Sequence, residues 1–349
     1  MDVVAEHKFE PMPMPEPRGP LSAGVVDVLR AERSPDDLPP PSVDDRYRGE
    51  AAEMLLDDDA QLALTMLYEL HLAGIAGVDD SWEWNAQLLG LRRSLEVPFD
   101  AALRAQAESI TLAARSEFGD DVVSALWEMT APTTDPGLAG FMAADADIEQ
   151  FREFVVHRSL NQLREADLHT CGIPRLQGPP KAALVEIQSD EYGGGRFDRM
   201  HSRLFARTMG ALGLSAHYAH YVDAVPALTL ASLNALSYFG IHRARLGALV
   251  GHLCAVETTS ALPSKRLAAG LRRLGFGVGA TQFFDEHVEA DSVHEQIAVR
   301  DLAGGLAMQQ PSYRDDILFG AATCLVFDEH LGAHMSRAWS RGVTSLRTR

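Results

Sequence analysis

Apolar residues recur at helical spacing in almost every segment of this chain after about residue 45. The stretches "AQLALTMLYELHLAGI" and "FDAALRAQAESITLAARSEF" both place apolar side chains every three or four residues. Alternating strand patterns and the turn signals of β-hairpins are missing. We therefore predict an all-α fold in which amphipathic helices bury their apolar faces against one another.

The helical pattern divides the chain into three parts. Residues 1–44 carry "EPMPMPEPRGP" and "SPDDLPPPSVDD", and these prolines predict an extended arm with one short helix at "LSAGVVDVLRAE". Such an arm is either a disordered tail or a segment that packs on a partner subunit. Residues 45–145 predict an N-terminal helical section, and residues 146–349 a compact helical bundle. The apolar run from Ala227 to Ser260 is either one kinked helix or two.

Composition and charge exclude several classes of function. The net charge of −18 argues against binding to nucleic acid or to an anionic membrane. The scattered cysteines Cys171, Cys254 and Cys324 form no CxxC motif, which excludes a disulfide framework and a cysteine zinc site. No signal-peptide pattern and no membrane-spanning apolar run is present. We therefore expect a cytoplasmic protein without nucleic-acid or membrane partners.

One helix carries a set of metal-ligand residue types. "HVEADSVH" contains His287, Asp291 and His294. At about 100° per residue, Asp291 and His294 lie within about 40° of the direction of His287. Two imidazoles and a carboxylate on one side suit iron, manganese or zinc. The alternative is a solvated acidic face with incidental histidines. The flanking Phe283 and Val293 favour an orientation toward the core.

Further ligands must come from other helices. Glu191 and His201 are separated by three glycines, Gly193 to Gly195, in "DEYGGGRFDRMH". On an unbroken helix these two side chains would lie roughly 15 Å apart along the axis, too far for one site. We therefore predict a kink, bulge or unwound turn at the glycines. Glu165, in "LREADLHT", is placed at the end of the preceding long helix, and the alternative is an exposed Glu that pairs with Arg164 or a nearby Lys.

Other polar residues on helices have simpler interpretations. Glu257 lies in the apolar segment "CAVETTS" and needs a partner if it is buried. A structural hydrogen bond is favoured over contact with a ligand histidine. Glu186 and Asp190, four residues apart, are interpreted as a pair on a helix surface. Glu69, in "YELHLAG", is interpreted as structural.

Taken together, the motifs resemble those of a known group. "LREAD", "KAALVEIQSDEYGGGRFDRMHSRLFARTMGALGL" and "FFDEHVEADSVHEQIA" are similar to segments of the haem-oxygenase-like di-iron oxidase superfamily, the iron-containing redox enzymes. "YELHLAGIAGVDDSWEWN", closer to the N-terminus, also resembles a recurring segment of this group, so the resemblance extends from about residue 45 to about residue 345. It implies a haem-oxygenase-like helical bundle with a helical N-terminal extension. It also implies two irons per chain, held by Glu165, Glu191, His201, His287, Asp291 and His294. Glu191 is the expected bridging ligand, and Glu191 and His201 are the expected catalytic residues.

The resemblance further implies an activity. It indicates an O2-dependent oxygenase or oxidase that forms a peroxo-diferric intermediate, with O2 as co-substrate and an external reductant. The substrate would be a small amine, amino acid or carboxylic acid, undergoing N-oxygenation, oxidative C–C cleavage or desaturation in secondary metabolism. A noncatalytic metal- or ligand-binding helical protein, or a metal-free hydrolase or lyase on a related fold, remain alternatives. A homodimer is a further expectation.

Overall fold

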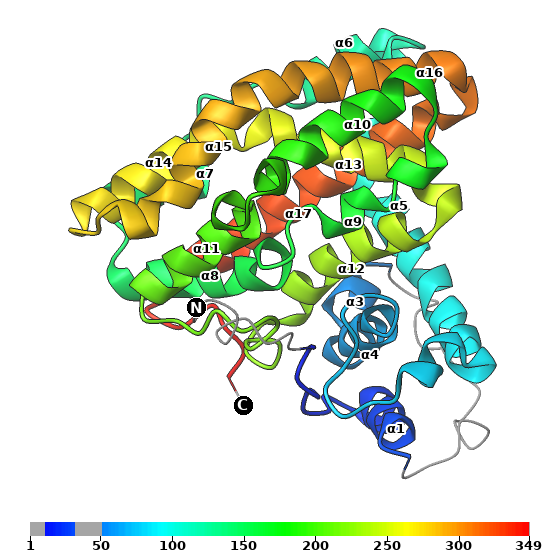
Figure 1. Cartoon of the computed structure of the whole chain (residues 1–349), viewed down its shortest axis with the longest axis vertical. Coiled ribbons are helices and arrows are strands. Elements are labelled where there is room, and N and C mark those ends of the chain that lie inside the picture. Colours follow the sequence, from blue (N-terminus) through cyan, green and yellow to red (C-terminus); the bar gives the residue numbers. More distant parts are fainter. Residues whose placement is uncertain (1–10, 32–50, 349) are drawn as a thin grey trace.

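The computed structural model describes residues 11–31 and 51–348 of the chain. Within these residues the regular elements are helices, and the β-structure consists of an isolated bridge between Met12 and Ile75. The all-α prediction is therefore confirmed. Figure 1 shows the helices and the course of the chain.

The first part of the chain forms the elements α1 (Pro20–Leu29), α3 (Ala51–Leu56), α4 (Asp58–Glu69), η2 (Asp80–Trp84), α5 (Ala86–Phe118), α6 (Val122–Met129) and α7 (Gly137–Ala144). Of these, α1 and α3 to α5 lie together at one end of the molecule, and α6 and α7 lie against the later helices (Figure 1). Capping residues mark where two of these helices begin. The side chain of Asp57 accepts hydrogen bonds from the first turn of α4, and that of Asn85 from the first turn of α5.

The remaining helices form the bundle. They are α8 (Ile148–Gln162), α9 (Asp167–Thr170), η3 (Ile173–Arg175), α10 (Gly178–Glu191), η4 (Gly193–Gly195), η5 (Phe197–Arg199), α11 (His201–Ala211), α12 (Ala227–Ile241), η6 (Arg243–Arg245), α13 (Leu246–Thr259), α14 (Ala261–Arg273), α15 (Val278–Gln296), the π-helix η7 (Ile297–Gly304), α16 (Gly305–Gln309), η8 (Pro311–Tyr313) and α17 (Arg314–Ser340). The long apolar run is thus two helices, α12 and α13, separated by η6.

The helices of the first part share a core with the bundle. α3 and α4 pack on α12, and α5 packs on α17. Figure 1 shows α3 and α4 beneath α12, and α10, α13 and α15 on its other side. A buried apolar cluster joins residues as far apart in sequence as Met12, Phe99, Phe239 and Met335. This shared core fixes the first part of the chain against the helices that carry the candidate ligands.

The described portion of the proline-rich arm packs on the chain itself. Arg18 has a buried side chain that donates hydrogen bonds to the carbonyl oxygens of Val222 and Val225, and it pairs with Asp58 at 2.8 Å. Ser22 Oγ donates to Asp59 at 2.6 Å. The predicted short helix is present as α1. The rest of the predicted arm lies outside the described residues.

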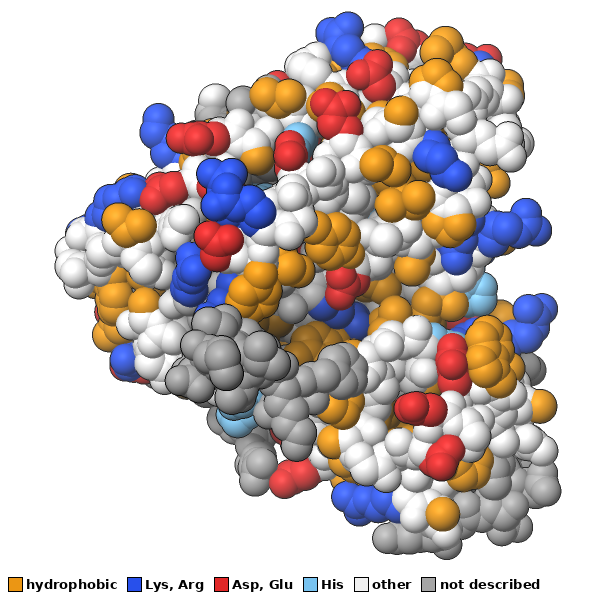
Figure 2. Space-filling model, in the orientation of Figure 1, with side chains coloured by type: hydrophobic (Ala, Val, Ile, Leu, Met, Phe, Trp, Pro, Cys, Tyr) orange, Lys and Arg blue, Asp and Glu red, His pale blue; other side chains and the backbone are white. Residues whose placement is uncertain are grey.

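The described surface carries mixed charge. On the face shown in Figure 2, acidic and basic side chains are interspersed. Among the described helices, none combines the length and the apolar character needed to cross a membrane.

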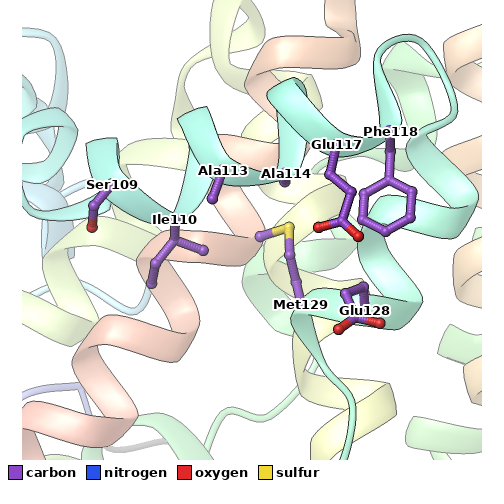
Figure 3. A pocket seen from close by; sticks show the side chains of 8 residues that line it. All are labelled: Ser109, Ile110, Ala113, Ala114, Glu117, Phe118, Glu128 and Met129. Atoms are coloured by element: carbon purple, nitrogen blue, oxygen red, sulfur yellow. The ribbon is translucent and has the colours of Figure 1, made fainter.

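A hollow of about 320 Å³ lies between α5 and α6. Figure 3 shows Ile110, Ala113 and Phe118 of α5 facing Met129 of α6, with Glu117 and Glu128 nearby. None of the described candidate ligands lines this hollow, so it has no part in the site below.

Candidate metal centre

The three glycines end one helix and allow the next to turn back. α10 ends at Glu191, and Gly193, Gly194 and Gly195 have φ values of 64°, 60° and 77°. These left-handed conformations favour glycine. A Cβ on Gly193 would lie 2.7 Å from the backbone of Arg199, so this position also requires a close approach. The prediction of an unwound turn is confirmed, although the glycines separate two helices instead of bending one.

The turn brings Glu191 and His201 together. α11 begins at His201, and His201 Nδ1 lies 2.9 Å from Glu191 Oε2. Both side chains are buried. Burial would raise the pKa of Glu191, but the charges of His201, His287 and His294 hold it below its usual value. Burial would lower the pKa of His201, and Glu191 and Glu165 raise it above its usual value.

Glu165 reaches the same place from a turn. α8 ends at Gln162, so the prediction that Glu165 lies at the end of that helix is wrong by three residues, and Glu165 belongs to the turn before α9. Glu165 Oε1 lies 3.5 Å from His287 Nε2, and Glu165 Oε2 lies 4.0 Å from His201 Nδ1. Gln162 Nε2 donates to Glu165 Oε1 at 2.7 Å. The turn therefore directs this carboxylate toward two imidazoles.

α15 presents His287 and His294 to the interior. Both imidazoles are buried, and Phe283 is buried against His287, as predicted. Val293, by contrast, is 58% exposed, because it lies on the opposite side of the helix from the bundle. His287 Nδ1 donates to the carbonyl oxygen of Phe283 at 2.7 Å. With Nδ1 held there, the ring directs Nε2 toward the carboxylate of Glu165.

Asp291 lies on α15 between these histidines. Its side chain is outside the described residues, so its ligand role stays a prediction.

His294 contacts two acids that the sequence had placed elsewhere. Its Nδ1 lies 3.2 Å from Oε2 of Glu257, a buried residue of α13, and its Nε2 lies 3.1 Å from Asp190 Oδ2. Glu257 is therefore in direct contact with a candidate ligand. Asp190, which we expected to form a surface pair with Glu186, contacts His294. Burial lowers the pKa of His294, but bonding to Glu257 and Asp190 raises it to about 9. The sequence feature that points to a buried partner for Glu257 is its position as an acidic residue within an apolar helical segment.

The donor atoms form two groups that share one residue. Atoms of Glu165, Glu191, His201 and His287 all lie within 4.8 Å of one another, and so do atoms of Glu191, Glu257 and His294. Glu191 belongs to both groups.

These donors fit a metal ion. Glu165 Oε2 is buried and accepts no hydrogen bond from the described residues. A carboxylate oxygen and an imidazole lone pair that face each other repel unless a cation or a proton lies between them. Oxygen and imidazole ligands suit iron.

The bundle matches a known family. A protein-family model, described as "iron-containing redox enzyme", matches residues 152–329 of the sequence. The chain belongs to the iron-containing redox enzyme family. All the predicted ligands, and Glu257 as well, lie within the matched residues. Family membership implies a haem-oxygenase-like fold, iron as the metal and redox chemistry as the reaction.

One curated relative of this chain is the nitrosourea synthase of Streptomyces achromogenes subsp. streptozoticus. It is 27% identical over 147 residues, which cover 42% of this chain and 31% of the relative. The chain thus matches about a third of that protein's length.

Proposed function

We propose that this chain is an O2-dependent oxygenase or oxidase with two irons, acting on a small amine, amino acid or carboxylic acid. The observation that carries the proposal is the membership of Glu191 in both donor groups. A carboxylate has two oxygens and can bridge two ions. Glu165, His201 and His287 would hold one iron, and Glu257, His294 and the predicted ligand Asp291 the other, with Glu191 between them. Bound iron would supply electrons to O2 and activate it toward the substrate.

The protein's own residues hold and orient these donors. The hydrogen bond from His287 Nδ1 to Phe283 fixes the ring with Nε2 facing Glu165. The Phe283 ring packs 4.4 Å from His287 and 6.5 Å from His201, between centroids, and keeps water from this side. In the metal-free chain, the Glu191 carboxylate, 2.9 Å from His201 Nδ1, favours a proton on the His201 imidazole. Metal binding must release it, because a ligand imidazole is neutral.

The relative supports amine substrates among the candidates. A nitrosourea contains an oxidised nitrogen, so the name of that synthase favours N-oxygenation. Insertion of one oxygen atom from O2 into an N–H bond releases the other oxygen as water and consumes two electrons and two protons. An external reductant would supply these electrons. Oxidative C–C cleavage or desaturation of a carboxylic acid makes similar use of O2.

The reaction with O2 tests the proposal. The protein is loaded with Fe(II) under anaerobic conditions, mixed with O2 in a stopped-flow spectrometer and followed at visible wavelengths. We expect a transient absorption band that forms and decays. Candidate amines and carboxylic acids are then added one at a time, and the substrate should accelerate the decay.

Two outcomes separate the alternatives. Two bound irons without any transient would contradict the oxygenase and favour a noncatalytic metal-binding protein. A transient whose decay no candidate accelerates would support O2 activation but contradict the substrate classes proposed here. The control is Glu191→Ala, which should give no transient.

A further inference from the structure

A buried ion pair connects the first part of the chain to the turn that carries Glu165. Arg164, the residue before Glu165, pairs through Nη1 with Oε1 of Glu69 at the end of α4. Both side chains are buried, with 7% and 1% exposure. Glu69 lies outside residues 152–329, the segment that the family model matches. The ion pair therefore joins a residue of the helical extension to a residue adjacent to a candidate ligand.

Two other elements hold the same ion pair. The Tyr218 hydroxyl donates to Glu69 Oε1 at 2.9 Å, and the guanidinium of Arg164 lies 5.6 Å from the centre of the Tyr218 ring. Arg164 Nη2 also lies 3.4 Å from Ser237 Oγ on α12. Since α4 packs directly on α12, the carboxylate of Glu69 has a fixed position relative to the bundle.

The turn itself needs such support. Ala166, on the other side of Glu165, has a φ of 77° and is buried. A left-handed alanine costs roughly 1–2 kcal/mol relative to a right-handed one. Such a conformation persists where its surroundings impose it. Arg164 directly precedes Glu165, so its ion pair with Glu69 restrains the backbone at this turn.

We propose that Glu69 is a positioning residue for the metal centre: through Arg164 it holds the turn that directs Glu165 toward His201 and His287. The inference rests on the ligand role of Glu165 in the proposed function. It assigns the helical extension a part in building the metal site. Without the Glu69 carboxylate, Arg164 becomes a buried and unpaired charge, and the turn must move to bring it to water. Glu165 then moves away from its imidazole partners.

Anaerobic titration of the full-length, metal-free protein with Fe(II) tests this role. The test variant is Glu69→Gln, which removes the charge and keeps the shape. We expect Fe(II) affinity to fall by about 10-fold to 100-fold, as is typical when a residue that orients a ligand is changed. The unfolding temperature of the metal-free variant is recorded in parallel.

A matched control lies in the same part of the chain. Glu96 of α5 is also buried and pairs with Arg92 at 3.3 Å and with His242 at 2.8 Å, away from the turn of Glu165. Glu96→Gln should lower the unfolding temperature and leave Fe(II) affinity unchanged. A merely structural role for Glu69 predicts that both variants behave alike.

The remaining outcomes are distinguishable. If Glu165→Ala binds Fe(II) as the unmodified chain does, the ligand role of Glu165 fails and the inference fails with it. If Glu165→Ala weakens binding but Glu69→Gln does not, the ligand role stands and the positioning role is overturned. Should Glu69→Gln not fold, Arg164→Lys replaces it. This variant keeps the charge but loses the planar guanidinium fork, and it should also weaken Fe(II) binding. Unchanged affinity in this folded variant would likewise overturn the positioning role.

Discussion

Two sets of buried histidines show how differently one side chain behaves in two parts of this bundle. His201 and His294 lie among carboxylates, and their pKa values are raised, that of His294 to about 9. His157 and His169 are buried to a similar extent, yet burial, with a second histidine close to each, lowers the pKa of both to about 3.

The neighbours of the second set explain this difference. His157 contacts the hydroxyls of Thr229 and Ser345, at 2.7 and 3.1 Å. His169 Nε2 lies 3.2 Å from Nδ1 of His252, whose pKa burial lowers to about 4. These imidazoles are kept neutral, because hydroxyls and a second imidazole do not compensate a buried positive charge, and the charges of Glu153 on His157 and of Glu191 on His169 offset burial only in part. Burial alone therefore does not mark a metal site; the acids around the first set give it the capacity to hold cations.

The largest expected effect is the loss of iron from the candidate metal centre, to which the first set of histidines belongs. Glu191→Ala removes the residue shared by both donor groups, so it should reduce iron per chain below half of that in the unmodified protein. His294→Ala removes a ligand of one group and should lower iron content by one ion. Iron per chain is measured after anaerobic loading and desalting.

The second set provides the control for this experiment. His157→Gln removes a similarly buried imidazole and should leave iron content unchanged. Unaltered iron in Glu191→Ala would refute the ligand assignment. Iron loss in His157→Gln equal to that in Glu191→Ala would remove the distinction between the two sets.

A smaller effect is expected at the glycine turn that precedes His201, a member of the first set. Gly193→Ala places a Cβ 2.7 Å from the backbone of Arg199 and Met200, just before His201. We expect it to displace His201, weaken Fe(II) binding by at least 10-fold and lower stability by about 3 kcal/mol.

Gly194→Ala is the matched substitution. Its φ is almost the same, but a Cβ there meets no atom within 4 Å. It should lower the free energy of unfolding by only about 1 kcal/mol and leave Fe(II) binding intact. Anaerobic Fe(II) titration and urea unfolding measure the two quantities. Equal Fe(II) affinity in the two variants would contradict the link between this turn and the position of His201.

Local patterns in the sequence were sufficient for part of the site. The 3.6-residue period placed His287 and His294 on one side of a helix, and the conformational cost of glycine indicated the turn before His201. Both depend on residues close together in the chain. The association of these segments with Glu165 came from the resemblance to a family, since no local rule brings distant helices together.

Contacts between distant residues were the part that sequence reasoning missed. Glu257 contacts His294 from 37 residues away, and Glu69 contacts Arg164 from 95 residues away. Asp190 was assigned to Glu186 because helical spacing identifies neighbours on the same helix only. Spacing carries no information about the residues that a facing helix presents, so acids at packed interfaces were interpreted as surface or structural groups.

The smallest expected effect concerns acid stability and the second set. The pKa of His157 is about 3 in the folded chain and about 6.5 when unfolded. Between these values the unfolded state binds a proton that the folded state does not, so stability falls as pH decreases below about 6.5. From pH 7.5 to pH 5.5, His157 should account for a loss of about 1.4 kcal/mol.

Urea unfolding of the metal-free protein at these two pH values isolates this contribution. His157→Gln should lower stability at pH 7.5, because it disturbs the contacts with Thr229 and Ser345, but it should reduce the loss between the two pH values by about 1.4 kcal/mol. If His157→Gln loses as much stability on acidification as the unmodified chain, His157 is not held neutral by its surroundings. The contrast between the two sets would then fail at this histidine.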